Sequence, residues 1–138
     1  GIRAGNIVAA HGSTTIGVIE RVHERASVVR LFSSSGEKMD ALLGTEDTPI
    51  QAEGVGGGNF RATAPKDIVV ALGDQIMINS ADAPLLGIVG EVRTVPSSSF
   101  QEILFQTPVN IYTLKWVEVL LETSYPPIDG REELRNEE

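Results

Sequence analysis

The chain has 138 residues, a length that suits one domain or two small β-subdomains that share a core. It contains no cysteine, which excludes thiol catalysis, thiolate metal ligands and disulfide bonds. Its formal net charge of −8 argues against a nucleic acid partner, because a surface that follows phosphates needs clustered lysine and arginine.

The composition also bears on the membrane. No apolar run approaches the roughly 20 residues that span a bilayer, and the first residues lack the basic start and apolar run of a signal peptide. We therefore expect the printed chain to be soluble. Because it begins with Gly1 rather than methionine, we also expect it to derive from a longer protein, in which any membrane anchor would lie upstream.

Short β-rich runs alternate with turn signals along most of the chain. Turns rich in glycine, serine and proline separate them at intervals of roughly ten residues, a spacing typical of a sandwich or a small barrel. The pattern predicts a mostly antiparallel all-β fold. The expected strands cover residues 16–22, 27–32, 39–43, 68–72, 75–78, 88–95, 103–107 and 114–121.

One glycine-and-aliphatic phrase occurs twice. The first copy leads from residues 5–8 into residues 16–22, and the second leads from residues 73–78 into residues 86–92. Each copy predicts a β-hairpin whose second strand contains a glycine, which lets another backbone come close. Internal duplication and chance resemblance both explain the likeness.

The last expected strand ends the ordered part of the chain. Period-two alternation over residues 114–122 places Lys115 and the valines on the core face and Trp116 on the opposite face, near a rim. A lone tryptophan there is more typical of interface or core-edge packing than of a ligand platform. Residues 123–138 are charged and poor in apolar side chains, so we expect a flexible acidic tail.

The two histidines offer the clearest candidates for acid-base or metal chemistry. His11 falls in the first predicted hairpin turn, and His23 opens a charged turn. A metal would need a third ligand, and Glu24 and Asp40 are merely the nearest acids, without the spacing of a known site. We interpret both histidines as surface residues.

The glycine-rich and serine-rich segments complete no known catalytic motif. Residues 54–59 lack the Lys-Ser/Thr of a phosphate loop and run into Phe60, so a bulge or a crowded barrel crossing explains their glycines better. No Gly-x-Ser-x-Gly elbow is present. A serine hydrolase that uses Ser80 or a residue of 97–99 remains an alternative. We predict no catalytic, cofactor-binding or metal-binding residue.

Taken in order, several phrases resemble the extracytoplasmic β-domain of the rod shape-determining protein MreC. The likeness runs from residue 2 to residue 122 and departs from the family around residues 79–85, where the family commonly has a glycine-richer loop. The phrases that resemble the family are residues 5–8 with 16–19, residues 51–60, residues 65–67 with 73–74, residues 86–92, residues 100–108 and residues 114–119.

The resemblance implies a pair of small antiparallel β-barrel-like subdomains within residues 1–122, followed by the tail. It also implies an upstream membrane helix and coiled coil, and therefore an extracytoplasmic location on the periplasmic face of the cytoplasmic membrane. Proteins of this family are non-catalytic, cofactor-free scaffolds of the elongation complex. They bind a cell-wall transpeptidase and other proteins of that complex, and they self-associate.

Three residues are the predicted exposed anchors for such contacts. They are Phe60, beside three glycines, and Leu85 and Leu86, which follow a proline in a loop. The competing interpretation places each of them in the core. An adaptor domain of a transport or secretion system is a further functional alternative to the scaffold.

Overall fold

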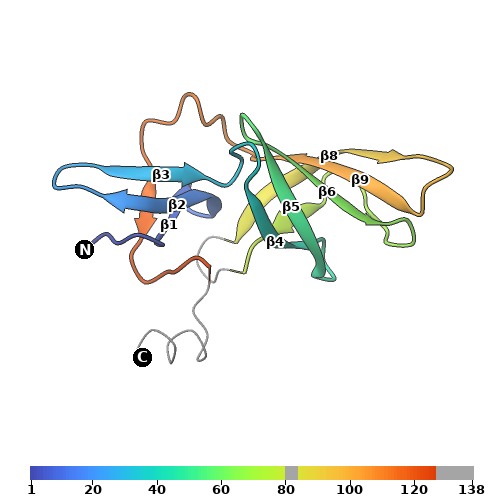
Figure 1. Cartoon of the computed structure of the whole chain (residues 1–138), viewed down its shortest axis with the longest axis horizontal. Helices are drawn as coiled ribbons and strands as arrows, with labels where there is room; N and C mark the ends of the chain where they lie inside the picture. Colours follow the sequence, from blue (N-terminus) through green and yellow to red (C-terminus); the bar gives the residue numbers. More distant parts are fainter. Residues whose placement is uncertain (80–83, 127–138) are drawn as a thin grey trace.

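The computed structural model describes residues 1–79 and 84–126, and these residues form ten β-strands and no helix (Figure 1). The expected all-β class is therefore confirmed. In chain order the strands are β1 (Ile7–Ala10), β2 (Thr14–Val22), β3 (Ser27–Leu31), β4 (Lys38–Leu43), β5 (Thr48–Gly56), β6 (Asn59–Pro65), β7 (Gln75–Met77), β8 (Leu85–Thr94), β9 (Phe100–Gln106) and β10 (Glu118–Leu120).

The middle of the chain forms a closed barrel. Strands β4, β7, β8, β9, β6 and β5 pair in that order, and β5 pairs with β4 to close the ring. Every pairing in the ring is antiparallel, as predicted for a small barrel. Alternation along β6 confirms which face is inside, since its even-numbered residues are buried and its odd-numbered residues are exposed.

Both ends of the described chain build a second unit, which we call the terminal sheet. Its strand order is β10-β1-β2-β3, with antiparallel pairing throughout. The terminal sheet lies beside the barrel (Figure 1), and Thr14 of β2 pairs with Leu85 of β8 in a short parallel bridge between the two. The barrel is thus formed by one continuous stretch of the chain, whereas the terminal sheet combines strands that are far apart in the sequence.

The repeated phrase has the same hydrogen bonding in both copies. Gly5 N donates to Ile19 O over 2.8 Å, and Gly73 N donates to Val89 O over 2.8 Å. In both copies this glycine has a positive φ, 93° in the first and 90° in the second, a conformation that favours glycine. The entry turn of each hairpin is therefore built in the same way.

The strand registers of the two copies also agree. Val8 pairs with Gly17 and Ile76 pairs with Gly87, and the register shifts directly afterwards, with Ile16 of β2 and Leu86 of β8 as the extra residues. The next pair of strands, β2–β3 or β8–β9, carries its bulge two residues after the glycine in each copy. This agreement of register and irregularity favours duplication over chance resemblance.

The close backbone approach expected at the second-strand glycines is present in both copies. A Cβ on Gly17 would clash with the carbonyl oxygen of Arg30 on β3. A Cβ on Gly87 would lie 2.6 Å from Cδ2 of Phe105 and 2.9 Å from the carbonyl oxygen of Gln106. Both glycines therefore let strands cross at distances that no side chain tolerates.

A continuous apolar core fills the barrel and extends to the terminal sheet. Phe60 and Phe105 stack inside it, with ring centroids 4.8 Å apart and nearly parallel planes. A second cluster (Val8, Ala10, Ile16 and Ile19) lies on the terminal sheet, where Val109 and Leu114 of residues 107–117 cover it. We call residues 107–117 the crossing segment, because they lead from β9 of the barrel to β10 of the terminal sheet.

Two expected strands differ from the structure. Residues 68–72 form a loop between β6 and β7, since the side-chain amide of Gln101 donates to the carbonyl oxygen of Ile68 and holds the loop against β9. The last strand contains only 118–120 rather than 114–121. Its pairing with β1 ends at Ala9 with Glu118, and continuing that register would place Trp116 opposite the turn at His11 (φ 51°), where β1 has already ended.

Residues 123–126, which we expected to belong to the tail, pack onto the terminal sheet. Ile7 N donates to Thr123 Oγ1 over 2.8 Å, and Tyr125 N donates to Gly5 O over 2.8 Å. The Tyr125 ring meets Phe32 edge-on, and burial, with a further effect from the Asp40 carboxylate, raises the pKa of its phenol. Residues 127–138 of the expected tail lie outside the described residues.

Removing one hydroxyl from the core is expected to stabilise the protein. Thr15 on β2 is fully buried, and its Oγ1 has no hydrogen-bond partner in the described part of the chain. Such a hydroxyl costs about 1–3 kcal/mol. Thr15→Val replaces it with a methyl group of similar shape and should raise the free energy of unfolding by about 1 kcal/mol, measured by urea denaturation with an unchanged m-value.

The matched control is Thr94→Val on the exposed end of β8, which should stay within about 0.5 kcal/mol of wild type. Destabilisation by Thr15→Val would mean that the hydroxyl has a partner, such as a buried water, in solution.

Candidate functional site

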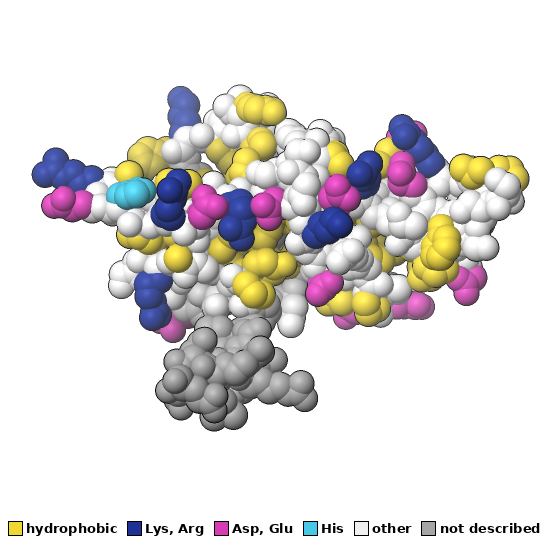
Figure 2. Space-filling view, viewed as in Figure 1, with side chains coloured by type: hydrophobic (Ala, Val, Ile, Leu, Met, Phe, Trp, Pro, Cys, Tyr) yellow, Lys and Arg dark blue, Asp and Glu magenta, His cyan; other side chains and the backbone are white. Residues whose placement is uncertain are grey.

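Several charged side chains on the outer surface form ion pairs. Figure 2 shows acidic and basic groups alternating along one face of the molecule. Arg30 contacts Glu20 and Glu37 at 3.7 and 3.4 Å, and Arg61 contacts Glu53 at 3.3 Å. These pairs are exposed, so each adds little stability. They place an acidic group beside Arg30 and beside Arg61.

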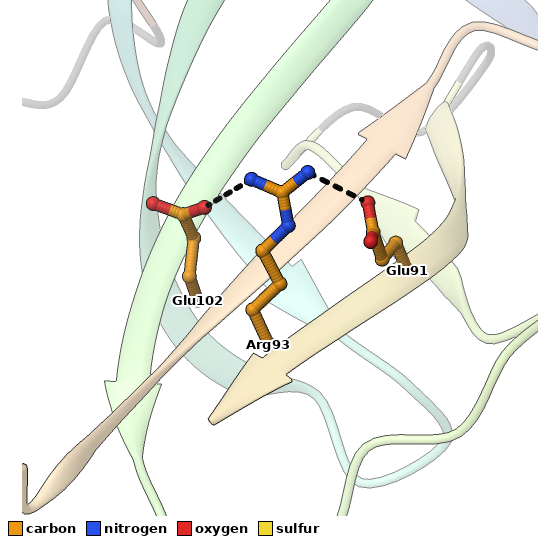
Figure 3. A network of polar contacts seen from close by, with 3 residues as sticks. All are labelled: Glu91, Arg93 and Glu102. Atoms are coloured by element: carbon orange, nitrogen blue, oxygen red, sulfur yellow. Dashed lines mark hydrogen bonds and ion pairs between the residues drawn. The ribbon is translucent and has the colours of Figure 1, made fainter. Parts of the chain in front are cut away.

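The clearest of these pairings spans two long neighbouring strands of the barrel. Arg93 on β8 lies between Glu91 on the same strand and Glu102 on β9, at 3.2 and 3.6 Å (Figure 3). Arg93 and Glu102 are also direct cross-strand partners in the ladder. The arrangement is a solvated ladder of opposite charges.

The three predicted anchors differ in burial. Phe60 and Leu86 are only 2% and 0% exposed and belong to the core, so the expectation that these two are exposed is wrong. The even-numbered face of β6 points inward and takes Phe60 with it, and Leu86 packs in the same core cluster. Leu85 is half-buried at the bridge between β2 and β8, and its role as a partner contact stays a prediction.

The catalytic alternative finds no support at its described serines. Ser97 and Ser99 are exposed in the β8–β9 turn, and Ser98 Oγ accepts a hydrogen bond from Phe100 N over 3.1 Å. No described histidine, aspartate or glutamate forms a hydrogen bond with them, whereas a nucleophilic serine needs such a base. Ser80, the other candidate, lies outside the described residues.

The histidines lie where the sequence analysis expected them. His11 and His23 are both exposed in turns. Among the described residues, no three histidine or acidic side chains gather as metal ligands would. Nor does that part of the chain contain a helix long and apolar enough to cross a membrane.

Exposed apolar residues lie in the loops at the end of the barrel away from the terminal sheet (Figure 1). We call Val69, Val95 and Phe100 the tip surface; Val69 is 90% exposed and Phe100 is 53% exposed. Lys66 ties the loops together, since its Nζ donates to Val95 O over 2.6 Å and its backbone N to Ser99 O over 3.0 Å. Rigid loops that hold apolar groups in water are typical of interaction surfaces.

A second surface lies on the terminal sheet, around the only tryptophan. Trp116 is 87% exposed and lines a depression of about 610 Å³. We call it the Trp116 depression. The turn between β1 and β2 forms one wall through His11 and Gly12, and the end of the crossing segment forms the other wall.

The sequence analysis missed the tip surface for an identifiable reason. It assigned Val69 to a strand, where alternation would have buried part of the run. The available signal was the turn composition on either side, with Pro65 and Lys66 before Val69, and the three serines before Phe100. Large apolar residues beside turns are candidates for exposure.

Comparison with solved structures identifies the architecture. The chain is similar to MreC from Pseudomonas aeruginosa with a TM-score of 0.76 and 13% identity, covering 86% of this chain and 81% of that one. It is similar to MreC from Listeria monocytogenes with a TM-score of 0.71 and 16% identity, covering 90% of this chain and 64% of that one. This chain has the MreC fold.

A further similarity involves a complex. The chain matches one from the complex between penicillin-binding protein PBP2 and MreC of Helicobacter pylori, with a TM-score of 0.58, 13% identity, and coverage of 86% of this chain and 80% of that one. No family model matches the sequence, and no curated protein matches it. The MreC likeness is thus one of fold, which the sequence resemblance had anticipated.

Proposed function

We propose that this chain is a binding module of a cell-shape scaffold, and that it docks onto a transpeptidase of the penicillin-binding class. The observation that carries the proposal is the fold, which is similar to that of MreC and to a chain of the PBP2–MreC complex. Paired charges and exposed turn serines on the described surface agree with a protein that works by binding rather than by catalysis.

The tip surface is the proposed docking site for the transpeptidase. It offers apolar groups on loops that the Lys66 contacts hold in place, so little conformational entropy is lost on binding. Docking there would favour whichever state of the enzyme binds the tip surface better. Leu85 remains a second predicted contact, at the bridge between the two units.

The proposal includes self-association and a location. The outer edges of β3 and β10 pair with no described strand, and such edges are templates for pairing between copies. By similarity to MreC, we propose that the domain works on the periplasmic face of the cytoplasmic membrane, held there by other parts of the full-length protein.

A capture experiment with the transpeptidase of the same cells tests the function. We expect the wild-type chain to retain it, and Phe100→Glu to weaken binding at least about 10-fold, because a charge would be buried in an apolar contact. Val22→Glu is the matched control, since Val22 is similarly exposed but lies on the terminal sheet. Biolayer interferometry would give the dissociation constants.

The two parts of the proposal fail differently. No retention by the wild-type chain or by the full-length protein in membranes contradicts the scaffold function itself. Equal binding by wild type and Phe100→Glu contradicts only the choice of the tip surface.

A further inference from the structure

The Trp116 depression has a feature that the fold itself does not use. Its tryptophan is the only one in the chain and is 87% exposed, although burying an aromatic side chain is among the largest stabilising contributions available. The crossing segment is nevertheless fixed, because Val109 and Leu114 pack against the apolar cluster beneath it. The indole is therefore presented on a held backbone.

The wall opposite the terminal sheet is also held in shape. Asn110 Oδ1 accepts from Tyr112 N over 3.0 Å, and Thr113 Oγ1 donates to Asn110 O over 3.2 Å. These bonds form a side-chain-capped turn of the kind that asparagine stabilises. Asn110 and Thr113 both line the depression, so their polar groups are positioned before any ligand arrives.

The lining of the depression is chemically mixed. Besides the indole, it contains side chains that donate or accept hydrogen bonds: His11, Asn110, Thr113, Lys115 and Glu118. A groove for an amphipathic helix is hydrophobic, which this mixed lining is not. A sugar ring instead presents an apolar C–H face, which suits an indole, and a rim of hydroxyl groups, which suits this polar set.

We propose that the Trp116 depression binds a saccharide chain, with one sugar ring stacked on Trp116 and an anionic group of the glycan held by Lys115. The volume of about 610 Å³ falls within the roughly 300–1,000 Å³ typical of small-molecule sites. Lys115 is exposed and is the only lysine or arginine in the lining, so it is the side chain there that can pair with an acidic group, against the opposing charge of Glu118. The site lies on the terminal sheet, away from the tip surface.

The single tryptophan makes binding directly measurable. The probes are a neutral chito-oligosaccharide and a peptidoglycan glycan fragment of the same length that carries carboxylates. Both should change the intensity and wavelength of Trp116 fluorescence in a saturable way. The acidic fragment should bind about 3-fold to 10-fold more tightly at low salt, and this advantage should shrink as salt is added.

Variants tested by calorimetry separate the contributions of the side chains. Trp116→Ala should weaken binding of both probes about 10-fold or more without changing the unfolding transition, since the side chain is exposed. Lys115→Gln should remove only the preference for the acidic probe. Phe100→Ala on the tip surface is the control and should leave both affinities unchanged.

Specific results would overturn the inference. Unchanged fluorescence with both probes contradicts a saccharide site, as does wild-type affinity in Trp116→Ala. Equal affinity for the two probes contradicts the role of Lys115. If Trp116→Ala abolishes capture of the transpeptidase while neither glycan binds, the depression is a protein contact and the saccharide proposal is wrong.

Discussion

Replacing Gly54 with alanine should destabilise the fold more than any other single methyl group added to a described glycine. A Cβ there would lie 2.6 Å from the carbonyl oxygen of Phe32 and 2.6 Å from the carbonyl carbon of Ser33, with Ser34 O also in conflict. All three obstacles are backbone atoms, which cannot rotate away as a side chain can.

The surrounding hydrogen bonds prevent the strand from retreating. Gly54 N donates to Glu37 O over 2.7 Å, and Gly54 O accepts from Gly36 N over 3.0 Å. Moving β5 outward would break both bonds at the connection that joins the terminal sheet to the barrel. We expect a loss of about 3 kcal/mol or more, a large share of the roughly 5–15 kcal/mol that keeps such a domain folded.

Urea denaturation measures this loss. Far-UV circular dichroism is the signal to monitor, because the fluorescence of the exposed Trp116 reports poorly on unfolding. Gly90→Ala is the matched control. Gly90 lies in β8 without a positive φ, and no atom comes within 4 Å of the position that a Cβ would take there. The stability of this variant should therefore stay within about 0.5 kcal/mol of wild type. A Gly54→Ala protein as stable as Gly90→Ala would contradict the described crossing.

Phe60→Ala is expected to lower stability by about 3–5 kcal/mol, because it removes a buried ring and leaves a cavity. The ring is 2% exposed and stacks on Phe105 at 4.8 Å, so the loss includes both transfer and aromatic contact. Denaturation by urea measures it, and Phe60→Leu should cost less because it refills part of the volume.

The same variant separates two roles for Phe60. A surface anchor would lose affinity for a partner and keep its stability, whereas a core residue loses stability. Phe100→Ala, on the half-exposed ring of the tip surface, is the comparison and should cost less than about 1 kcal/mol. Similar stability losses for Phe60→Ala and Phe100→Ala would contradict the assignment of Phe60 to the core.

The hairpins could be predicted from the sequence because the residues that form a hairpin turn are close together in the chain. The two glycine-bearing phrases predicted both hairpins and their close crossings, and the register of Gly17 and Gly87 confirmed them. The glycine run at 54–59 predicted a bulge or crossing, and β5 has its register shift between Gly54 and Gly56. Glycine alone has no side chain and adopts a positive φ easily, so its position in the sequence marks where the backbone needs either property.

The surfaces were harder to predict, because exposure depends on which distant strand lies alongside. Phe60 looks like an exposed residue beside three glycines, yet it becomes core once β6 pairs with β9. The 114–117 run alternates like a strand but has no partner, since the pairing of β10 with β1 ends at Ala9 with Glu118. Its unpaired end is what leaves Trp116 in water.

The terminal sheet combines strands from both ends of the described chain, which affects the order in which strands can pair during synthesis. Every strand of the barrel lies between Lys38 and Gln106, so the barrel is complete once that stretch has emerged. β1 cannot pair with β10 until β10 has been synthesised, more than a hundred residues later. Ile7, for example, pairs with Leu120. We expect this domain to mature from the barrel outward, with β1 among the last strands to find its partner.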